Sequence, residues 1–369
     1  MRIALVALSC PDGGMLHYTS QLANALAARA EVHLFTPDRP EVRAYLDSRV
    51  RLHGTTGLSR PHETLRNYLR QLNPLAHAAN AAAVRAVQPD VVHVVTDHPS
   101  NGLLLALLGP VPVVFTHHDP VRHPGEGHRV KQWLTDDVAR AADRVIVHAD
   151  ALVPELRRLG LPAGRAAVIP HGEFGFMRRY APDVREEPMI LCFGRLIRYK
   201  GVDDLCRAER LLRGRIGPYR IVIAGEGDTA FFRDEIAPDA PIEVIDRFLD
   251  DAEAADLFAR ARLVALPYVQ ASQSGVLAIA AAFGKPSIVT AVGGLPEAVD
   301  HGRAGVIIPP RDPAALAGAI AALWDDAPRR AALGAAGRAL VDRSIGWPRI
   351  ATLHLALYAD LQGKQAMAA

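Results

Sequence analysis

Short and uniformly apolar runs recur along this chain, and they constrain its fold more than any other feature. The runs at residues 3–9 (IALVALS), 91–95 (VVHVV) and 111–116 (VPVVFT) are rich in Val, Leu and Ile and do not alternate polar with apolar residues. Such runs are typical of strands buried on both faces, as in parallel sheets covered by helices. Helical segments separate the runs in both halves of the chain, which predicts an α/β fold.

The chain is long enough for two domains of ordinary size, since it has 369 residues. A first strand–helix series ends near residue 172, and a polar, Pro-containing stretch at 173–188 is interpreted as a linker. A second series runs over 189–346, and we expect a C-terminal helix at about 347–369 to pack back on the first domain. The sequence predicts two doubly wound domains.

Composition and charge exclude several classes of protein. The formal net charge of +2 argues against a dedicated nucleic-acid binder. No run approaches the roughly 18 apolar residues of a membrane-spanning helix. Cys10, Cys192 and Cys206 are far apart and lack metal-site spacing, which favours a reducing cytosol. We therefore expect a cytoplasmic protein without a metal or a cofactor.

The stretch at 267–297 combines a strand end, a polar loop, a helix of small residues and a second strand. Ser272 and Ser274 are both candidate N-caps and Gly275 allows a close backbone approach, while Gly284 and Pro286 end the helix. The N-terminus of such a helix carries free N–H groups and a partial positive charge, which suit a diphosphate. An ordinary crossover between two strands is an equally good interpretation of this stretch alone.

Histidines are concentrated in the first half of the chain, and four of them stand just past predicted strand ends: His98, His117, His118 and His171. His117 and His118 are neighbours, so they point to opposite sides if strand geometry persists, and at most one of them faces a given cleft. The residues between 60 and 70 are basic and include Arg60, Arg66 and Arg70. They suit a solvated helix better than a membrane-facing one, and peripheral membrane contact at the inner membrane surface stays open.

An ordered set of short motifs resembles the retaining glycosyltransferases of family 4 (group 1), which have the GT-B fold. The motifs are Gly13-Gly14 after the first strand, PDVVHVV (89–95), VVFTHHDP (113–120), VIPHG (168–172), FGRLIRYKGV (193–202), IAGEGD (223–228), FGKP (283–286) and GGLPEAV (293–299). The resemblance covers nearly the whole chain. It implies two Rossmann-like domains facing a central cleft, with the acceptor held by the first and a nucleotide-sugar by the second.

The resemblance implies transfer of a hexose, with retention, from a nucleoside-diphosphate sugar to a glycan, lipid-linked or small-molecule acceptor, as in polysaccharide biosynthesis. It assigns His118 and Asp119 to the catalytic centre, and His17 and Arg122 to the acceptor side. The donor-binding set comprises Gly13, Gly14, Arg195, Lys200, Glu226, Phe248, Leu249, Ser274, Gly275 and Val276. Arg195 and Lys200 flank one loop, so the guanidinium fork and the ammonium can both reach one diphosphate.

The chain departs from the family pattern at three positions. Ala271 and Ile279 stand where two glutamates usually contact the donor sugar and the ribose, and Arg247 stands where Gly is common. The loss of the two carboxylates keeps open a non-catalytic scaffold that binds nucleotide or carbohydrate, and a GT-B sugar-nucleotide epimerase is a further alternative. The loss also removes the feature that would indicate the nucleobase of the donor.

Overall fold

The computed structural model describes residues 1–8, 13–55, 73–98, 100–121 and 129–368. The described residues divide into two compact units. Unit 1 comprises those up to residue 172 together with 346–368, and unit 2 comprises residues 173–345. Cys10, Arg122 and the basic segment at 60–70 lie outside the described residues.

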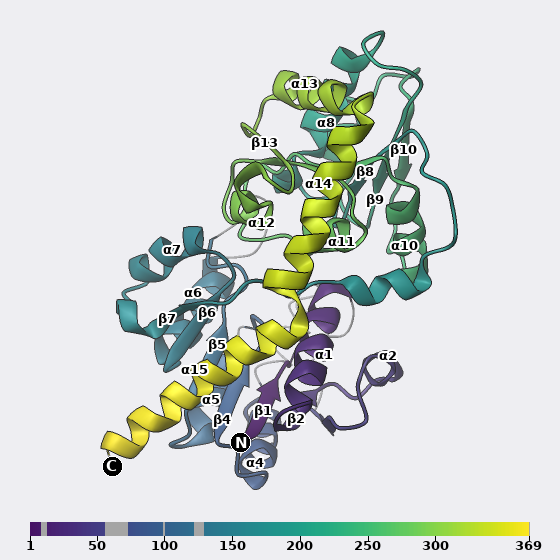
Figure 1. Cartoon of the computed structure of the whole chain (residues 1–369). Helices are drawn as coiled ribbons and strands as arrows, with labels where there is room; N and C mark the ends of the chain where they lie inside the picture. Colours follow the sequence, from purple (N-terminus) through teal and green to yellow (C-terminus); the bar gives the residue numbers. More distant parts are fainter. Residues whose placement is uncertain (9–12, 56–72, 99, 122–128, 369) are drawn as a thin grey trace. The chain divides into compact units, whose positions relative to one another are not determined.

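Unit 1 is built around a seven-stranded sheet with the order β3-β2-β1-β4-β5-β6-β7, in which every pair is parallel (Figure 1). Its strands are β1 (Arg2–Val6), β2 (Glu31–Thr36), β3 (Arg51–Gly54), β4 (Val91–Val94), β5 (Val113–Thr116), β6 (Arg144–Val147) and β7 (Ala166–Val168). Its helices are α1 (Gly13–Ala27), α2 (Pro40–Ala44), α4 (Pro74–Ala86), α5 (Asn101–Leu108), α6 (Arg129–Ala141), α7 (Val153–Arg158) and α15 (Trp347–Ala368), with 3-10 turns η1 (Asp150–Leu152) and η2 (Ala163–Arg165).

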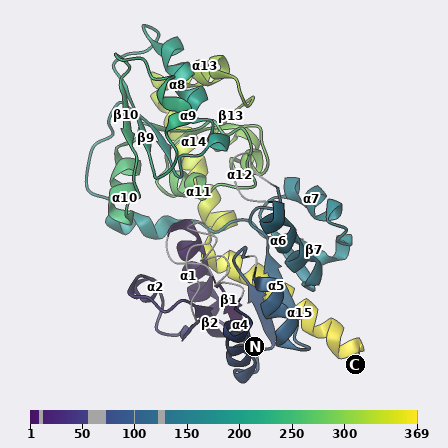
Figure 2. The ribbon, with the colours of Figure 1, turned by 180° about the vertical axis from the view of Figure 1, so that it is seen from behind.

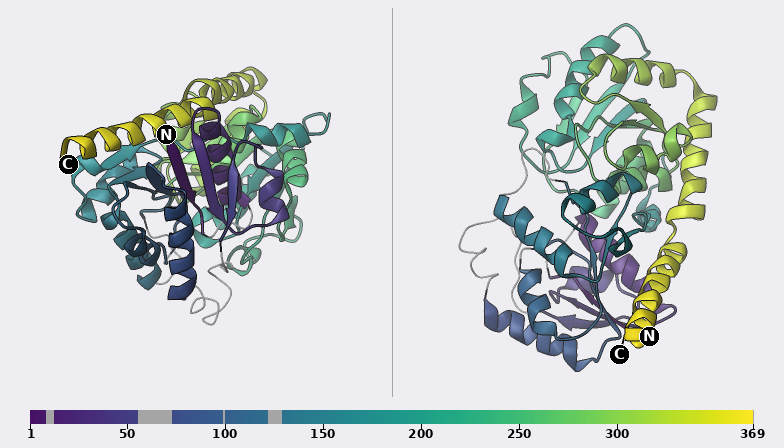
Figure 3. Two further views of the ribbon diagram at one scale, coloured as in Figure 1. Left: turned by 90° about the horizontal axis from the view of Figure 1, so that it is seen from below. Right: turned by 90° about the vertical axis from the view of Figure 1, so that its left-hand side faces the viewer.

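Alternate residues of β1 face two different cores, which is what a strand buried on both faces requires. Ile3 and Leu5 share one core with α1 and with Tyr358 of α15, whereas Ala4 and Val6 share the other with α4, α5 and α6. Figure 1 shows α1 and α15 over the first face, and Figure 2 shows α5 and α6 over the second. Figure 3 shows α15 running along the unit 1 sheet.

Unit 2 contains a six-stranded parallel sheet with the order β10-β9-β8-β11-β12-β13. Its strands are β8 (Met189–Phe193), β9 (Arg220–Ala224), β10 (Ile242–Ile245), β11 (Leu263–Leu266), β12 (Ser287–Thr290) and β13 (Val306–Ile308). Its helices are η3 (Gly175–Tyr180), η4 (Arg198–Lys200), α8 (Val202–Leu212), α9 (Ala230–Arg233), α10 (Asp251–Arg260), α11 (Gly275–Ala282), α12 (Leu295–Ala298), η5 (Asp300–Gly302), α13 (Pro313–Trp324), α14 (Ala327–Leu340) and the π-helix η6 (Val341–Ile345).

The two faces of the unit 2 sheet are also covered separately. Ile190 and Cys192 of β8 pack with α8 and α13, while Leu191 packs with α10 and α11 on the opposite face. In both units the chain reverses the direction in which it adds strands, between β1 and β4 in unit 1 and between β8 and β11 in unit 2. Doubly wound sheets bind ligands at the carboxyl ends of the strands beside such a switch point.

Two segments differ from the sequence predictions. The stretch at 173–188, interpreted as a linker, instead belongs to unit 2, because Phe174 and Met177 are buried in the core formed by α10 and α11. The edge strand β3 was not predicted, since its sequence RLHG contains no apolar run. None of the described helices is long and apolar enough to cross a membrane. Peripheral membrane contact stays a prediction.

Candidate functional site

The loop after β8 lies against the loop after β11, at the switch point of unit 2. Gly194 follows β8 with a φ of 114°, and Gly201 follows η4 with a φ of 64°. A Cβ atom at Gly201 would collide with the carbonyl oxygen of Pro267, so only glycine permits this approach of the two backbones. The amide of Val269 donates to the Tyr199 carbonyl at 2.8 Å and fixes the same contact.

Two tyrosines hold the two cations that the sequence assigned to a diphosphate. The Lys200 Nζ atom lies 3.8 Å from the centroid of the Tyr268 ring and 5.2 Å from that of Tyr199. Arg195 donates from Nη2 to the Tyr199 hydroxyl at 3.4 Å. The two rings meet edge to face, with centroids 6.4 Å apart. The structure therefore brings Arg195 and Lys200 to one place.

The N-terminus of α11 belongs to the same neighbourhood. Ser274 is the N-cap in extended conformation, and its Oγ accepts from the Leu277 amide at 3.4 Å. The same Oγ lies 3.3 Å from the Tyr268 hydroxyl. Val276 packs on the loop after β8, since a Cβ on Gly194 would lie 3.2 Å from its Cγ2. Ser274, Gly275 and Val276 thus stand beside the Lys200 loop.

The remaining donor-side residues follow β9 and β10, the next two strands of the sheet. Glu226 is exposed, and its carbonyl accepts from the Leu196 amide at 3.0 Å. Phe248 is 53% exposed, whereas Leu249 is buried at 8%. Arg247 forms an ion pair with Glu253 at 2.6 Å, so this departure from the family pattern is anchored to α10. All these residues lie at the carboxyl edge of the sheet.

The two missing carboxylates are replaced by buried apolar side chains. Ala271 and Ile279 belong to the core between α11 and the sheet. Next to them, Ser272 Oγ and Gln273 Oε1 are buried and have no hydrogen-bond partner among the described residues. Sequence reasoning considered Ser272 only as an alternative N-cap and gave Gln273 no role, although the polar run ASQS before a small-residue helix was a signal.

In unit 1, His118 is held at both ring nitrogens. Its Nε2 donates to the Val95 carbonyl at 2.8 Å, and its Nδ1 lies 3.0 Å from Nε2 of His148. His148 in turn donates from Nδ1 to the Ile169 carbonyl at 2.9 Å. These contacts join the ends of β4, β5, β6 and β7, which are neighbours in the sheet.

Tyr18 of α1 lies at the centre of this histidine cluster. Its ring centroid is 4.9 Å from that of His118, 5.4 Å from His148 and 5.0 Å from His171. Burial lowers the pKa of His118, takes that of His148 well below its ordinary value, and lowers that of His171 to about 3. Burial therefore favours the neutral form of all three imidazoles. The sequence indicated His118 and His171, but it missed Tyr18 and His148.

His117 points to the other side of the loop, as the strand geometry predicted. It is fully buried, with Asp97 at 3.3 Å from Nδ1 and Asp136 at 3.6 Å from Nε2. Burial lowers the pKa of His117, but the negative charges of the two nearby carboxylates outweigh it and raise the pKa to about 9. A buried imidazolium between two carboxylates therefore anchors the loop that carries His118.

The ion pairs of His117 with Asp97 and Asp136 lead to a testable prediction about pH and stability. The pKa of His117 in the folded protein, about 9, lies above the ordinary 6.5. The stabilisation from its protonated form is therefore complete below pH 6.5 and is lost as pH rises through 9. The difference corresponds to at most about 3 kcal/mol. We expect His117→Gln to remove this fall in the thermal unfolding midpoint between pH 6.5 and 9. His301→Gln, at an exposed histidine, is the control, and an unchanged slope in His117→Gln would contradict the assignment.

The other unit 1 residues of the predicted site lie near the start of α1 and after β5. Gly13 has a φ of 64°, and no described heavy atom lies within 4 Å of a Cβ built at Gly13 or Gly14. His17 is buried and packs edge to face on Tyr45 at 4.9 Å. Asp119 is half-buried and acts on His118 and His171 through its charge. Arg122 lies outside the described residues.

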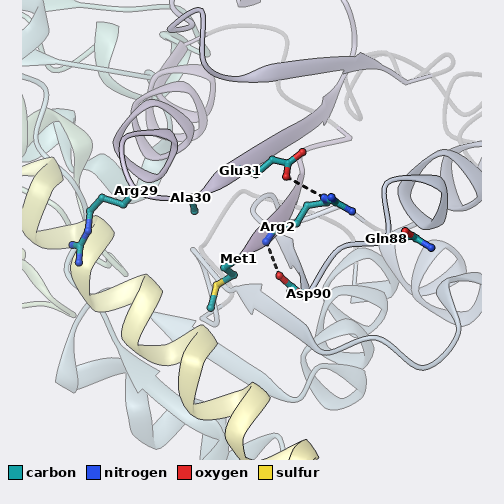
Figure 4. A pocket seen from close by; sticks show the side chains of 7 residues that line it. All are labelled: Met1, Arg2, Arg29, Ala30, Glu31, Gln88 and Asp90. Carbon is teal, nitrogen blue, oxygen red and sulfur yellow. Dashed lines mark hydrogen bonds and ion pairs between the residues drawn. The ribbon is translucent and has the colours of Figure 1, made fainter.

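A hollow of about 590 Å³ occurs elsewhere in unit 1, at the amino ends of β1, β2 and β4 (Figure 4). It is lined by Met1, Arg2, Arg29, Ala30, Glu31, Gln88 and Asp90. Arg2 pairs with Glu31 at 3.2 Å, and its amide donates to Asp90 at 2.6 Å. Because the hollow lies at the amino end of the sheet, it is separate from the predicted site. Among the described residues no group of three or more His, Cys, Asp or Glu could hold a metal.

Comparisons with known proteins agree with this arrangement. Residues 12–172 match the model of Glycosyltransferase Family 4, and residues 187–326 match that of Glycosyl transferases group 1. A D-inositol 3-phosphate glycosyltransferase from Pseudarthrobacter chlorophenolicus is 30% identical, over 97% of this chain and 94% of the relative. A glycogen synthase from Mycobacterium tuberculosis is 31% identical, over 74% of this chain and 69% of the relative.

Solved structures share the architecture. Sucrose-phosphate synthase from Thermosynechococcus elongatus superimposes with a TM-score of 0.77 at 22% identity, covering 98% of this chain and 99% of that one. Anabaena HepE in complex with UDP-glucose gives a TM-score of 0.74 at 19% identity, covering 97% and 100%.

The two sheets and these neighbours show the GT-B fold, and the family models and curated relatives make the chain a glycosyltransferase. More specifically, the chain belongs to glycosyltransferase family 4 (group 1). The sequence predictions of fold, family and enzyme class are confirmed. The roles of individual residues remain predictions.

Proposed function

We propose that this glycosyltransferase moves a hexose, with retention, from a nucleoside-diphosphate sugar to a hydroxyl of a glycan, lipid-linked or small-molecule acceptor. The observation that carries the donor part is the convergence of Arg195 and Lys200 beside the N-terminus of α11. Two cations and free backbone N–H groups at a switch point are the chemistry that binds a diphosphate.

Relatives support a nucleotide-sugar donor without deciding its base. Anabaena HepE is described with UDP and with UDP-glucose. A GDP-mannose-dependent alpha-(1-6)-phosphatidylinositol monomannoside mannosyltransferase from Mycobacterium tuberculosis is 30% identical over 45% of this chain and 46% of the relative. In this chain we assign Phe248 and Leu249 to the nucleobase. Ala271 and Ile279 provide no carboxylate for the ribose or the sugar.

The proposed chemistry needs no protein nucleophile. The bond between the anomeric carbon and the diphosphate oxygen breaks, and the acceptor oxygen bonds to the same face of that carbon. The acceptor proton passes to an oxygen of the leaving diphosphate. Arg195, Lys200 and the N–H groups of Gly275 and Val276 stabilise the charge that builds on this diphosphate. His118 and Asp119 of unit 1 are assigned to the transferred sugar.

A thermal-shift panel of UDP, GDP, ADP and dTDP, each with its glucose or mannose derivative, tests the donor assignment. A nucleotide at about a hundred times its Kd adds about 2.7 kcal/mol to stability and raises the unfolding midpoint. We expect one base to give a clear shift, followed by transfer from its sugar to an acceptor. If no nucleotide shifts the midpoint, the donor assignment is wrong.

Two further outcomes would overturn the transfer reaction. Formation of an epimer when the donor sugar is incubated without acceptor would favour the epimerase. Tight nucleotide binding without transfer to glycan, lipid-linked and small-molecule acceptors would favour a binding scaffold.

A further inference from the structure

We propose that Tyr268 is a positioning residue that fixes Lys200 and the N-terminus of α11 for the same diphosphate. The ring would hold the Lys200 ammonium, and the hydroxyl would hold Ser274, the cap of α11. This inference rests on the proposed donor site and adds to it a residue that makes no contact with the reacting atoms.

The ring of Tyr268 is a rigid platform for a cation. The side chain is buried, with 1% of its surface exposed, and Tyr199 packs against it edge to face. Its carbonyl accepts from the hydroxyl of Thr290 at 2.5 Å, which ties the backbone to the end of β12. The 3.8 Å between Lys200 Nζ and the ring centroid is well inside the range of a cation–π contact.

The hydroxyl of Tyr268 connects this platform to α11. Burial raises the pKa of Tyr268 far above its ordinary value, so the phenol keeps its proton and can donate to Ser274 Oγ at 3.3 Å. Ser274 Oγ also accepts from the Leu277 amide, and a hydroxyl oxygen has two lone pairs for these two donors. One side chain thereby links the cation to the helix N-terminus.

A ring is a suitable support for a cation that must bind an anion. A carboxylate partner would compete with the diphosphate for the ammonium, whereas a ring attracts the cation and leaves its charge available.

The test compares Tyr268→Leu with Tyr268→Phe. The leucine variant loses the ring, so we expect the Kd for UDP or GDP, whichever the wild type binds, to rise about tenfold. Phenylalanine keeps the ring, and we expect it to restore the Kd to within about threefold of the wild type. Tyr219→Leu is the matched control, because Tyr219 packs on Trp324 away from the site and should leave the Kd unchanged.

A double-mutant cycle separates positioning from a general structural effect. In a Lys200→Ala background, Tyr268→Leu should cause little further loss of nucleotide binding, because the cation it positions is absent. An equal loss in both backgrounds, or a wild-type Kd in Tyr268→Leu, would overturn the proposal. If the wild type itself binds no nucleoside diphosphate, it is the donor assignment that fails.

A measurement on the wild type covers the case in which Tyr268→Leu does not fold. The Lys200 side-chain protons next to Nζ lie over the ring, so their NMR resonances should be shifted upfield. Lys200→Arg assigns these resonances by their disappearance. Ordinary lysine shifts at Lys200 would contradict the placement of the ammonium on the Tyr268 ring.

Discussion

Replacing Arg195 or Lys200 with alanine is expected to lower kcat/KM for the donor by about 10²–10³-fold, the usual loss when one preorganised group that stabilises developing charge is removed. Charge builds on the leaving diphosphate during transfer, and both side chains lie beside the N-terminus of α11. Steady-state kinetics with the donor found by thermal shift measure the effect. Arg195→Lys tests the planar fork separately, since lysine keeps the charge but cannot bind two oxygens in parallel.

Arg198→Ala is the matched control for both variants. Arg198 lies in the same η4 turn as Lys200 but is exposed, with its guanidinium 5.4 Å from the centroid of the Phe231 ring. We expect its loss to leave kcat/KM within about twofold, as for ordinary surface positions. Full activity in both Arg195→Ala and Lys200→Ala would show that the diphosphate binds elsewhere.

The strands buried on both faces were predictable, and the edge strand was not. β1, β8 and β11 lie inside their sheets, so their side chains on both faces are apolar and the sequence shows a continuous run. β3 pairs with β2 alone and ends in exposed residues, so burial imposes no apolar pattern on RLHG. A strand of this kind is defined by its neighbour and not by its own residues.

The stretch at 173–188 also could not be predicted from its own residues, although part of it is buried. Charged residues dominate its composition, which is why it resembles a linker. Phe174 and Met177 are buried because α10 and α11, which come about 75 to 110 residues later in the chain, pack against η3. Local composition contains no information about that partner.

Some residues of the candidate site were also predictable from local sequence, and others were not. Arg195, Lys200 and Gly275 were predictable because each lies within a short motif, and the motifs occur in the family order. Tyr268 was not, because its proposed role depends on contact with Lys200, which is distant in sequence and is brought close by the approach of Gly201 to Pro267. Local sequence therefore indicates candidate ligand-binding groups better than the groups that would hold them.

His118→Ala is expected to lower kcat by about 10²-fold, the lower end of the range for a positioned catalytic group, while leaving the Kd for nucleoside diphosphate within about twofold. The donor phosphates are assigned to unit 2, whereas His118 belongs to unit 1. If His118 acts near the transferred sugar, its loss should therefore lower kcat and leave the Kd for the nucleoside diphosphate nearly unchanged. Stopped assays for kcat and calorimetry with UDP or GDP measure the two quantities.

The contacts of the His118 ring indicate how it acts. Both nitrogens already face protein groups, Val95 on one side and His148 on the other, so we expect the ring to position its loop and not to transfer a proton. His118→Asn keeps an amide that can donate to the Val95 carbonyl, and we expect it to recover part of kcat. His33→Asn, at a buried histidine of β2 stacked on His53, is the control. Because burial lowers the pKa of His118, the pH profile of the wild-type kcat should show no histidine ionisation between pH 7 and 8. If the profile does show such an ionisation and His118→Asn removes it, the ring is a proton-transfer group instead.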